Sequence, residues 1–383
     1  MNFDLDTDQL ALQESLQKFF SREYDFEHRR AILNSPLGYS ESIWAALAEQ
    51  GALAVGLPET HGGFGGPVET MLVMEEIGKS LVLEPFLSTV VLCGSVLADR
   101  GSDAQQREIL AGIANGSRRL ALAHYEEGSR YDIEFVETSA RAAGDSYLLD
   151  GLKTVVLDGG VASLFIVSAR LRPEGRLLLF LLGPHTPGLE ITAYRTQDGR
   201  NAADLCLREA RIPAAALLGD ADALPAIRHA IDRANAALCA EAVGAMEALN
   251  RATLEYLKSR RQFGQPIGRF QALQHRMADM FIYATQARSM SLLATGRSSM
   301  PDAATRGHSI SAAKAFIGKA ARFIGQEAVQ LHGGMGMADE LPVSHYFKRL
   351  TMINATFGDV DHHVTAVSDA IGAIPRASND HEL

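Results

Sequence analysis

The 383-residue sequence is poor in cysteine and has no long hydrophobic run. Its three cysteines, Cys93, Cys206 and Cys239, are odd in number and widely spaced, which argues against a disulfide framework and against a cysteine-based zinc site. We expect three isolated buried thiols in a cytoplasmic protein. No apolar run approaches membrane-spanning length, so we expect no membrane insertion. The start, Met-Asn-Phe-Asp-Leu-Asp, is acidic where a signal peptide would be basic.

A long basic run is also missing. The 36 Lys and Arg residues are outnumbered by 46 Asp and Glu residues, and the formal net charge is -10 at pH 7. This balance argues against a nucleic-acid-binding surface. No internal repeat is visible, which argues against a solenoid. The chain is longer than the size at which one hydrophobic core keeps growing, so we expect two or three domains.

The first part of the chain has the apolar spacing of helices. Residues 10–20 and 43–48 carry this pattern, and it resumes after the glycine-rich stretch 56–66, which predicts a loop. From about residue 118 the pattern changes. Short β-branched and aliphatic runs alternate there with turn signals such as Asp150-Gly151, and they predict a small antiparallel β domain in the form of a barrel.

Helical spacing returns after Pro225 and continues to the end. It predicts long helices over 226–261, 270–297, 303–332 and 343–373, the last one broken near Gly358. Short loops between long helices favour an antiparallel four-helix bundle. The predicted fold class is therefore α+β and mainly α, with three parts: an N-terminal helical domain (1–117), a middle antiparallel β-barrel domain (118–222) and a C-terminal bundle (223–383).

Two sequence blocks in the C-terminal part carry the strongest functional signal. The first begins Arg260-Arg-Gln-Phe-Gly264; the Arg260 guanidinium suits a pyrophosphate, and Phe263 can pack on an aromatic ring. The alternative is a capped helix end with a solvated arginine pair. In the second block, the adjacent Gly333 and Gly334 let a backbone approach a ligand. They follow a long helix with the wrong spacing for a dinucleotide fingerprint, and the alternative there is a helix cap and a loop.

Together, in this order and about sixty residues apart, the blocks resemble the two flavin-binding signatures of the acyl-CoA dehydrogenase family. The order of helices, strands and helices extends the resemblance to the whole chain. It implies FAD as the cofactor and an oligomer, because the family uses these blocks to bind the FAD of a neighbouring subunit. The implied cofactor-binding residues are Arg260, Gln262, Phe263, Gln271, Gln330, Gly333 and Gly334.

The β domain supplies the rest of the flavin site in this family. The matching segments are 122–127 and 153–158, which point to His124, Val155 and Val156 as further cofactor contacts. The second segment departs from the family pattern. Leu157 stands where a threonine usually donates a hydrogen bond to the flavin.

The catalytic base expected from the resemblance is missing. Removing the α proton of an acyl-CoA needs a partly desolvated carboxylate. The usual glutamate position holds Gly358, and the position that some members use on the long helix holds Ala234. Glu241 lies seven residues later, near the same helical face, in an apolar run. The candidates are Glu241, then Asp359 or Asp361. The alternatives are a structural, hydrogen-bonded role for Glu241, an ion pair of Glu241 at a subunit contact, or no competent base in this chain.

The stretch from Phe357 to His363 also contains two aspartates and two histidines. Such residues can bind a metal, but no second His/Cys cluster accompanies them, so we expect contacts to substrate or cofactor and no metal. By this stretch the chain looks most like the small subunit of pimeloyl-CoA dehydrogenase and other two-gene acyl-CoA dehydrogenases.

The resemblance implies a function for the chain. It implies FAD-dependent oxidation of an acyl-CoA substrate to the trans-2-enoyl thioester, with electrons passed to an electron-transfer flavoprotein. It also implies a homo- or hetero-tetramer with a second acyl-CoA dehydrogenase chain. The alternatives are a non-catalytic, half-site FAD-binding partner subunit and an acyl-CoA oxidase.

Overall fold

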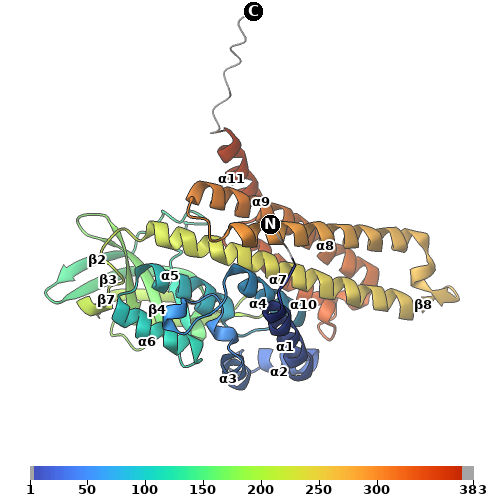
Figure 1. Ribbon diagram of the computed structural model, residues 1–383, viewed down its shortest axis with the longest axis horizontal. Helices are drawn as coiled ribbons and strands as arrows, with labels where there is room; N and C mark the ends of the chain where they lie inside the picture. Colours follow the sequence, from blue (N-terminus) through green and yellow to red (C-terminus); the bar gives the residue numbers. More distant parts are fainter. Residues whose placement is uncertain (1–3, 373–383) are drawn as a thin grey trace, which may run out of the picture.

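The structure, a computed structural model, describes residues 4–372, and the long helices of its C-terminal part run along its longest axis (Figure 1). The helical character predicted for the first part of the chain is confirmed. The glycine-rich stretch 56–66 is a loop with one 3-10 turn. The helices before the sheet are α1 (Thr7–Glu23), α2 (Phe26–Leu33), α3 (Glu41–Glu49), α4 (Pro67–Ser80), the π-helical segment η3 (Leu87–Cys93), α5 (Gly94–Arg100) and α6 (Asp103–Ala114).

Local capping explains where several of these helices begin. Asp6 accepts a hydrogen bond from the backbone N–H of Gln9, and the Gln9 side-chain oxygen accepts one from the Asp6 N–H. Ser102 and Gln105 form the same reciprocal pair at the start of α6. Pro67 begins α4, where its missing N–H costs nothing.

The middle of the chain forms one curled seven-stranded sheet. Its strands are β1 (Leu120–Ala123), β2 (Ser139–Ala143), β3 (Ser146–Leu157), β4 (Leu164–Leu171), β5 (Leu177–Leu182), β6 (Leu189–Arg195) and β7 (Asn201–Pro213). The order is β1-β4-β2-β3-β7-β6, and β5 pairs with β4. The sheet is mixed, not purely antiparallel, because β4 runs parallel to both β1 and β2. Turn residues mark where strands end but not which strands pair, so the sequence did not reveal these two parallel contacts.

The C-terminal part is a helical bundle with a small hairpin at its far end. Its elements are α7 (Leu224–Ser259), β8 (Arg261–Gln262), β9 (Gln265–Pro266), α8 (Gln271–Arg297), α9 (Ala303–His332), the 3-10 segment η7 (Gly333–Met337), α10 (Pro342–Ala355) and α11 (Val360–Gly372). The break expected near Gly358 is the loop between α10 and α11. With 36 residues, α7 is roughly 54 Å long and runs across most of the molecule (Figure 1).

The N-terminal helices and the bundle share one hydrophobic core. Helices α4 and α7 touch backbone to backbone: a Cβ on Gly78 would lie 2.0 Å from the Glu241 carbonyl oxygen, and one on Gly244 would lie 2.0 Å from the Glu75 carbonyl oxygen. This core contains residues from both sides of the predicted domain boundaries near residues 117 and 222. It therefore does not mark the boundaries, which stay a prediction. Within residues 4–372, the structure has no helix that is both long and apolar enough to cross a membrane.

Candidate functional site

The fold brings the two C-terminal sequence blocks together at one end of the bundle. The first block follows the C-terminal end of α7, and the second follows the C-terminal end of α9. They are joined through Tyr256, one turn before the first block on α7, and His332 of the second block, whose rings stack with centroids 4.3 Å apart. The Tyr256 hydroxyl also donates to the His332 carbonyl oxygen at 3.4 Å. Residues about seventy positions apart in the chain therefore form one surface.

This surface is open. Phe263 is 89% exposed, and a Cβ built on Gly333 or Gly334 would meet nothing within 4 Å. Arg260 presents its guanidinium at the end of α7, where it is exposed. Two adjacent glycines with open space around them, an exposed arginine and an exposed aromatic ring suit an anionic diphosphate with an attached ring system. The remaining residues implied by the resemblance, Gln262, Gln271 and Gln330, are exposed at the same end.

The three candidates in the β domain differ in what they can contact. His124 is buried, with Nδ1 2.9 Å from the Ser168 hydroxyl and Nε2 3.0 Å from the Ile133 carbonyl oxygen, so both ring nitrogens have partners. Val156 is 1% exposed, inside the sheet core. Val155 is 51% exposed, at a positive φ of 51°. Of the three side chains, Val155 alone offers an open apolar face to a flavin ring.

The β domain and the open surface lie at opposite ends of the molecule (Figure 1). Asn235 lies in the N-terminal half of α7, near the β domain, and Arg260 comes directly after the last residue of α7. The 25 positions between them correspond to roughly 37 Å of helix. One FAD does not reach from one region to the other within a single chain. A site that uses both regions needs two chains.

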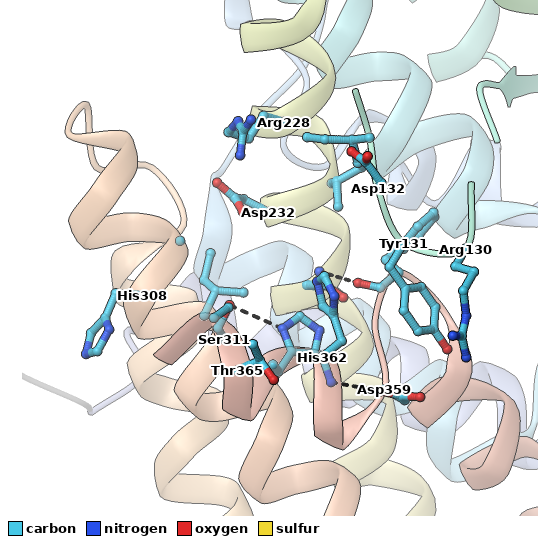
Figure 2. A pocket seen from close by; sticks show the side chains of 18 of the residues that line it. Arg130, Tyr131, Asp132, Arg228, Asp232, His308, Ser311, Asp359, His362 and Thr365 are labelled. Carbon is cyan, nitrogen blue, oxygen red and sulfur yellow. Dashed lines mark hydrogen bonds between the residues drawn. The ribbon is translucent and has the colours of Figure 1, made fainter. Parts of the chain in front are cut away.

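A cavity of about 980 Å³ opens between the β domain and the bundle. Its walls are the loop after β1, one face of α7, the first turns of α9, the α10–α11 loop and α11. Figure 2 shows Arg130, Tyr131 and Asp359 on one side of it and His308 on the other. The α7 residues in the wall are Arg228, Ile231, Asp232 and Asn235, the spacing of one helical face.

Glu241 does not belong to that face. It follows Asn235 by six positions, which turns it about 120° away from the cavity. Its side chain is 1% exposed, and both carboxylate oxygens accept hydrogen bonds from Arg349, each at 2.6 Å. Arg349 also binds Asp198 at 2.8 Å, and Arg200 lies 3.7 Å from Glu241. This arrangement favours the structural role for Glu241 over the role of base.

Asp359 and Asp361 both line the cavity. Asp359 also begins α11: its Oδ1 accepts from the backbone N–H of His362 at 2.9 Å, and its carbonyl oxygen accepts from the N–H of His363 at 3.1 Å. The loop before it is fastened by the buried Lys314, whose ammonium donates to the carbonyl oxygens of Thr356 at 2.8 Å and Gly358 at 3.0 Å.

An aromatic pair closes the inner end of the cavity. The rings of Tyr125 and Phe357 stack with centroids 6.0 Å apart, and both residues also line a hollow of about 20 Å³ next to Val155 and Leu157. That hollow has room for a single water and not for a flavin ring. The residues of this chain thus fit the diphosphate end of FAD. The flavin ring can reach only the exposed side of Val155 unless the Tyr125 and Phe357 rings separate. Sequence reasoning missed Tyr125, because its role depends on a contact with Phe357, 232 positions away.

Two buried histidines make the fold sensitive to acid. Burial lowers the pKa of His124 and of His363 to about 3, from an ordinary value of 6.5. Between pH 6.5 and 3 the unfolded chain therefore binds more protons at these positions than the folded chain does, so stability falls as the pH falls through this window.

We expect the free energy of unfolding to drop by about 2 kcal/mol per histidine between pH 6.5 and 5. Urea denaturation at both pH values measures it. His124→Gln keeps the possibility of hydrogen bonds to Ser168 and Ile133 but does not titrate. We expect a clearly shallower pH dependence for this variant, and a dependence identical to that of the wild type would contradict the assignment.

Comparisons with known proteins agree with this geometry. Residues 6–117 match the family described as acyl-CoA dehydrogenase, N-terminal domain, and residues 224–372 match acyl-CoA dehydrogenase, C-terminal domain. The chain is 30% identical to the probable acyl-CoA dehydrogenase YngJ of Bacillus subtilis, over 91% of this chain and 93% of that protein.

The names of two similar solved structures each join two proteins. A variant of the steroid acyl-CoA dehydrogenase Tcur3481-Tcur3483 is 30% identical, with a TM-score of 0.86 over 95% of this chain and 98% of that one. The ChsE4-ChsE5 complex of Mycobacterium tuberculosis is 26% identical, with a TM-score of 0.87 over 98% of this chain and 100% of that one. With both family domains matched over most of its length, the chain belongs to the acyl-CoA dehydrogenases, flavoprotein oxidoreductases that act on CH–CH bonds.

Proposed function

We propose that this chain takes part in the α,β-dehydrogenation of an acyl-CoA thioester to the trans-2-enoyl-CoA, with FAD as the hydride acceptor and an electron-transfer flavoprotein as the next electron carrier. The observation that carries the proposal is the 980 Å³ cavity beside the α10–α11 loop. It has the volume of a site for a drug-sized ligand and lies where the β domain meets the bundle.

The residues of the cavity have separate tasks in this proposal. Arg130 and Arg228 line it and are the candidate contacts for the phosphates of coenzyme A, and Arg228 now pairs with Glu134 at 3.2 Å. Asn235 is 3% exposed, and its Oδ1 has no hydrogen-bond partner within residues 4–372. A buried acceptor without a partner is costly, so this oxygen is suited to a donor on the ligand. Tyr125 and Phe357 keep water from the inner end.

FAD is proposed to lie between two chains. Arg260, Phe263, Gly333 and Gly334 of one chain would hold its diphosphate end, and the exposed side of Val155 in another would face its ring. This division follows from the distance between the two regions on α7. The two-chain names of the solved steroid and ChsE complexes support a second acyl-CoA dehydrogenase chain as the partner in a tetramer. A cytoplasmic location stays a prediction.

A second function has its own support. The closed Tyr125–Phe357 pair and the glycine at position 358 favour a half-site subunit that binds FAD for a partner and does not turn over substrate. Anaerobic mixing of the purified protein, with any chain that accompanies it, separates the two. Bleaching of the flavin by a panel of acyl-CoA thioesters supports the enzyme, and bound but unbleached flavin supports the half-site subunit. Rapid reoxidation of bleached flavin in air would identify an oxidase.

The shared-site proposal predicts the effect of one arginine. Arg260→Ala should lower the FAD content of the purified protein at least tenfold, because the diphosphate loses a charge-assisted hydrogen-bond donor. The matched control is Lys258→Ala, which removes an exposed cation from the same helix end and should keep the wild-type flavin content. Absorbance of the released flavin per polypeptide is the measurement. Full flavin occupancy in Arg260→Ala would overturn this assignment.

A further inference from the structure

The space that a side chain at position 358 would need is filled by two imidazole rings. Gly358 has a φ of 119°, and a Cβ built on it would lie 2.5 Å from Nε2 of His363 and 2.6 Å from Cδ2 of His362. The α10–α11 loop has therefore not simply lost a glutamate. It is packed so that the two imidazole rings occupy the space into which a glutamate side chain at position 358 would extend.

The two rings differ in access. His363 is 3% exposed, its Nδ1 lies 3.2 Å from the Ser311 hydroxyl, and its Nε2 is enclosed against Gly358. His362 is exposed and lines the cavity. Within residues 4–372 no hydrogen bond involves the ring nitrogens of His362, and its ring lies 5.2 Å from that of Tyr131 (Figure 2). His362 is thus the imidazole that a ligand in the cavity can touch, and His363 supports it from behind.

The charges around His362 keep it ready to accept a proton. Burial lowers its pKa from the ordinary value, Asp359 raises it and Lys314 lowers it, so that the ring is neutral at pH 7. The other titratable groups that face it are His363 on α11 and Tyr131 on the loop after β1. Once protonated, the ring would be an imidazolium next to the Asp359 carboxylate, which stabilises the charge.

Asp359 is less suited to the same task. Its Oδ1 is engaged by the His362 N–H at the start of α11, and this contact fixes the first turn that carries both histidines. Asp359 therefore positions His362 and supplies its countercharge.

From this geometry we propose that His362 is the proton acceptor for the α-carbon of the bound thioester, in place of a carboxylate at position 358. The inference rests on the proposed function. In the step, the α C–H bond breaks, its electron pair stays with the substrate as the thioester enolate, and the proton forms a new bond to a ring nitrogen of His362. No oxidant takes part in this step.

The experiment follows the proton without any oxidation. The purified protein, with any chain that accompanies it, is incubated in D₂O with an acyl-CoA that lacks a β C–H bond, and mass spectrometry measures deuterium at the α-carbon. His362→Gln should slow exchange at least 100-fold, in line with removal of a general base. Asp359→Asn keeps the cap and removes the carboxylate, so exchange should stay within about tenfold of the wild type. His28→Gln, which removes an exposed imidazole on α2 that does not line the cavity, should not change it.

Each outcome bears on a different statement. Wild-type exchange in His362→Gln would overturn the assignment, and loss of exchange in Asp359→Asn alone would make Asp359 the base. No exchange in the wild type with the thioester bound, measured by equilibrium dialysis, would also overturn it and would favour the half-site subunit. Absence of thioester binding would instead reject the proposed function. As an independent readout, the imidazole NMR signal assigned through His362→Gln should shift its titration when the thioester binds.

Discussion

Glu241→Gln is expected to lower the free energy of unfolding by about 3–5 kcal/mol, because it leaves a buried arginine without its main countercharge. Glu241, Arg349, Asp198 and Arg200 form a buried group of two carboxylates and two guanidinium groups. Burial alone would lower the pKa of Arg349, but Glu241 and Asp198 more than offset this and raise it. Without the Glu241 charge, one positive charge in this group is uncompensated.

Urea denaturation at pH 7 measures the loss. The matched control is Glu255→Gln on the same helix, where the partner Lys258 is 60% exposed and the expected change is below about 0.5 kcal/mol. A loss below about 1 kcal/mol in Glu241→Gln would show that the ion pair is not structural. Any activity change in this variant has to be interpreted together with its stability.

The sequence specified the helices well where their ends carry their own signals. The helix predicted over 303–332 has those bounds in the structure, because Asp302 caps its first turn and Gly333 adopts a φ of 60° after its last residue. Strand pairing could not be predicted in the same way. The short strand β1 is an Ala-Leu run that has meaning only beside β4, its parallel neighbour. Partners of this kind are chosen by tertiary packing, not by local propensity.

The site shows the same division. The open surface with Arg260 and Gly333 follows from motifs within the blocks, and the structure brings the blocks together. Glu241 stood out correctly as an acid in an apolar run, but its partner Arg349 lies 108 positions away and no local pattern reveals it. The roles of Tyr125 and His362 likewise depend on contacts across the fold. The sequence did show two histidines shortly after Gly358. The resemblance gave no reason to consider either of them as the base.

Gly358→Glu, the substitution that restores the usual glutamate, is expected to destabilise the protein by about 2–6 kcal/mol and to give no working base. A positive φ costs a non-glycine residue about 1–3 kcal/mol, and overpacking adds a similar amount. The contact atoms belong to the rings of His362 and His363, which can make room only by rotating out of their present positions. The added side chain must therefore displace the imidazoles on which we expect proton transfer to depend.

Urea denaturation and α-proton exchange of Gly358→Glu test this together. Gly175→Ala is the matched control, because Gly175 has a φ of 79° with open space around it and should cost only about 1–2 kcal/mol. Adding His363→Ala to Gly358→Glu makes room for the new side chain, so the double variant should lose less stability than the two single losses sum to. Strictly additive losses, or a Gly358→Glu protein as stable as the wild type with faster exchange, would mean that the imidazoles do not occupy the place of the missing carboxylate.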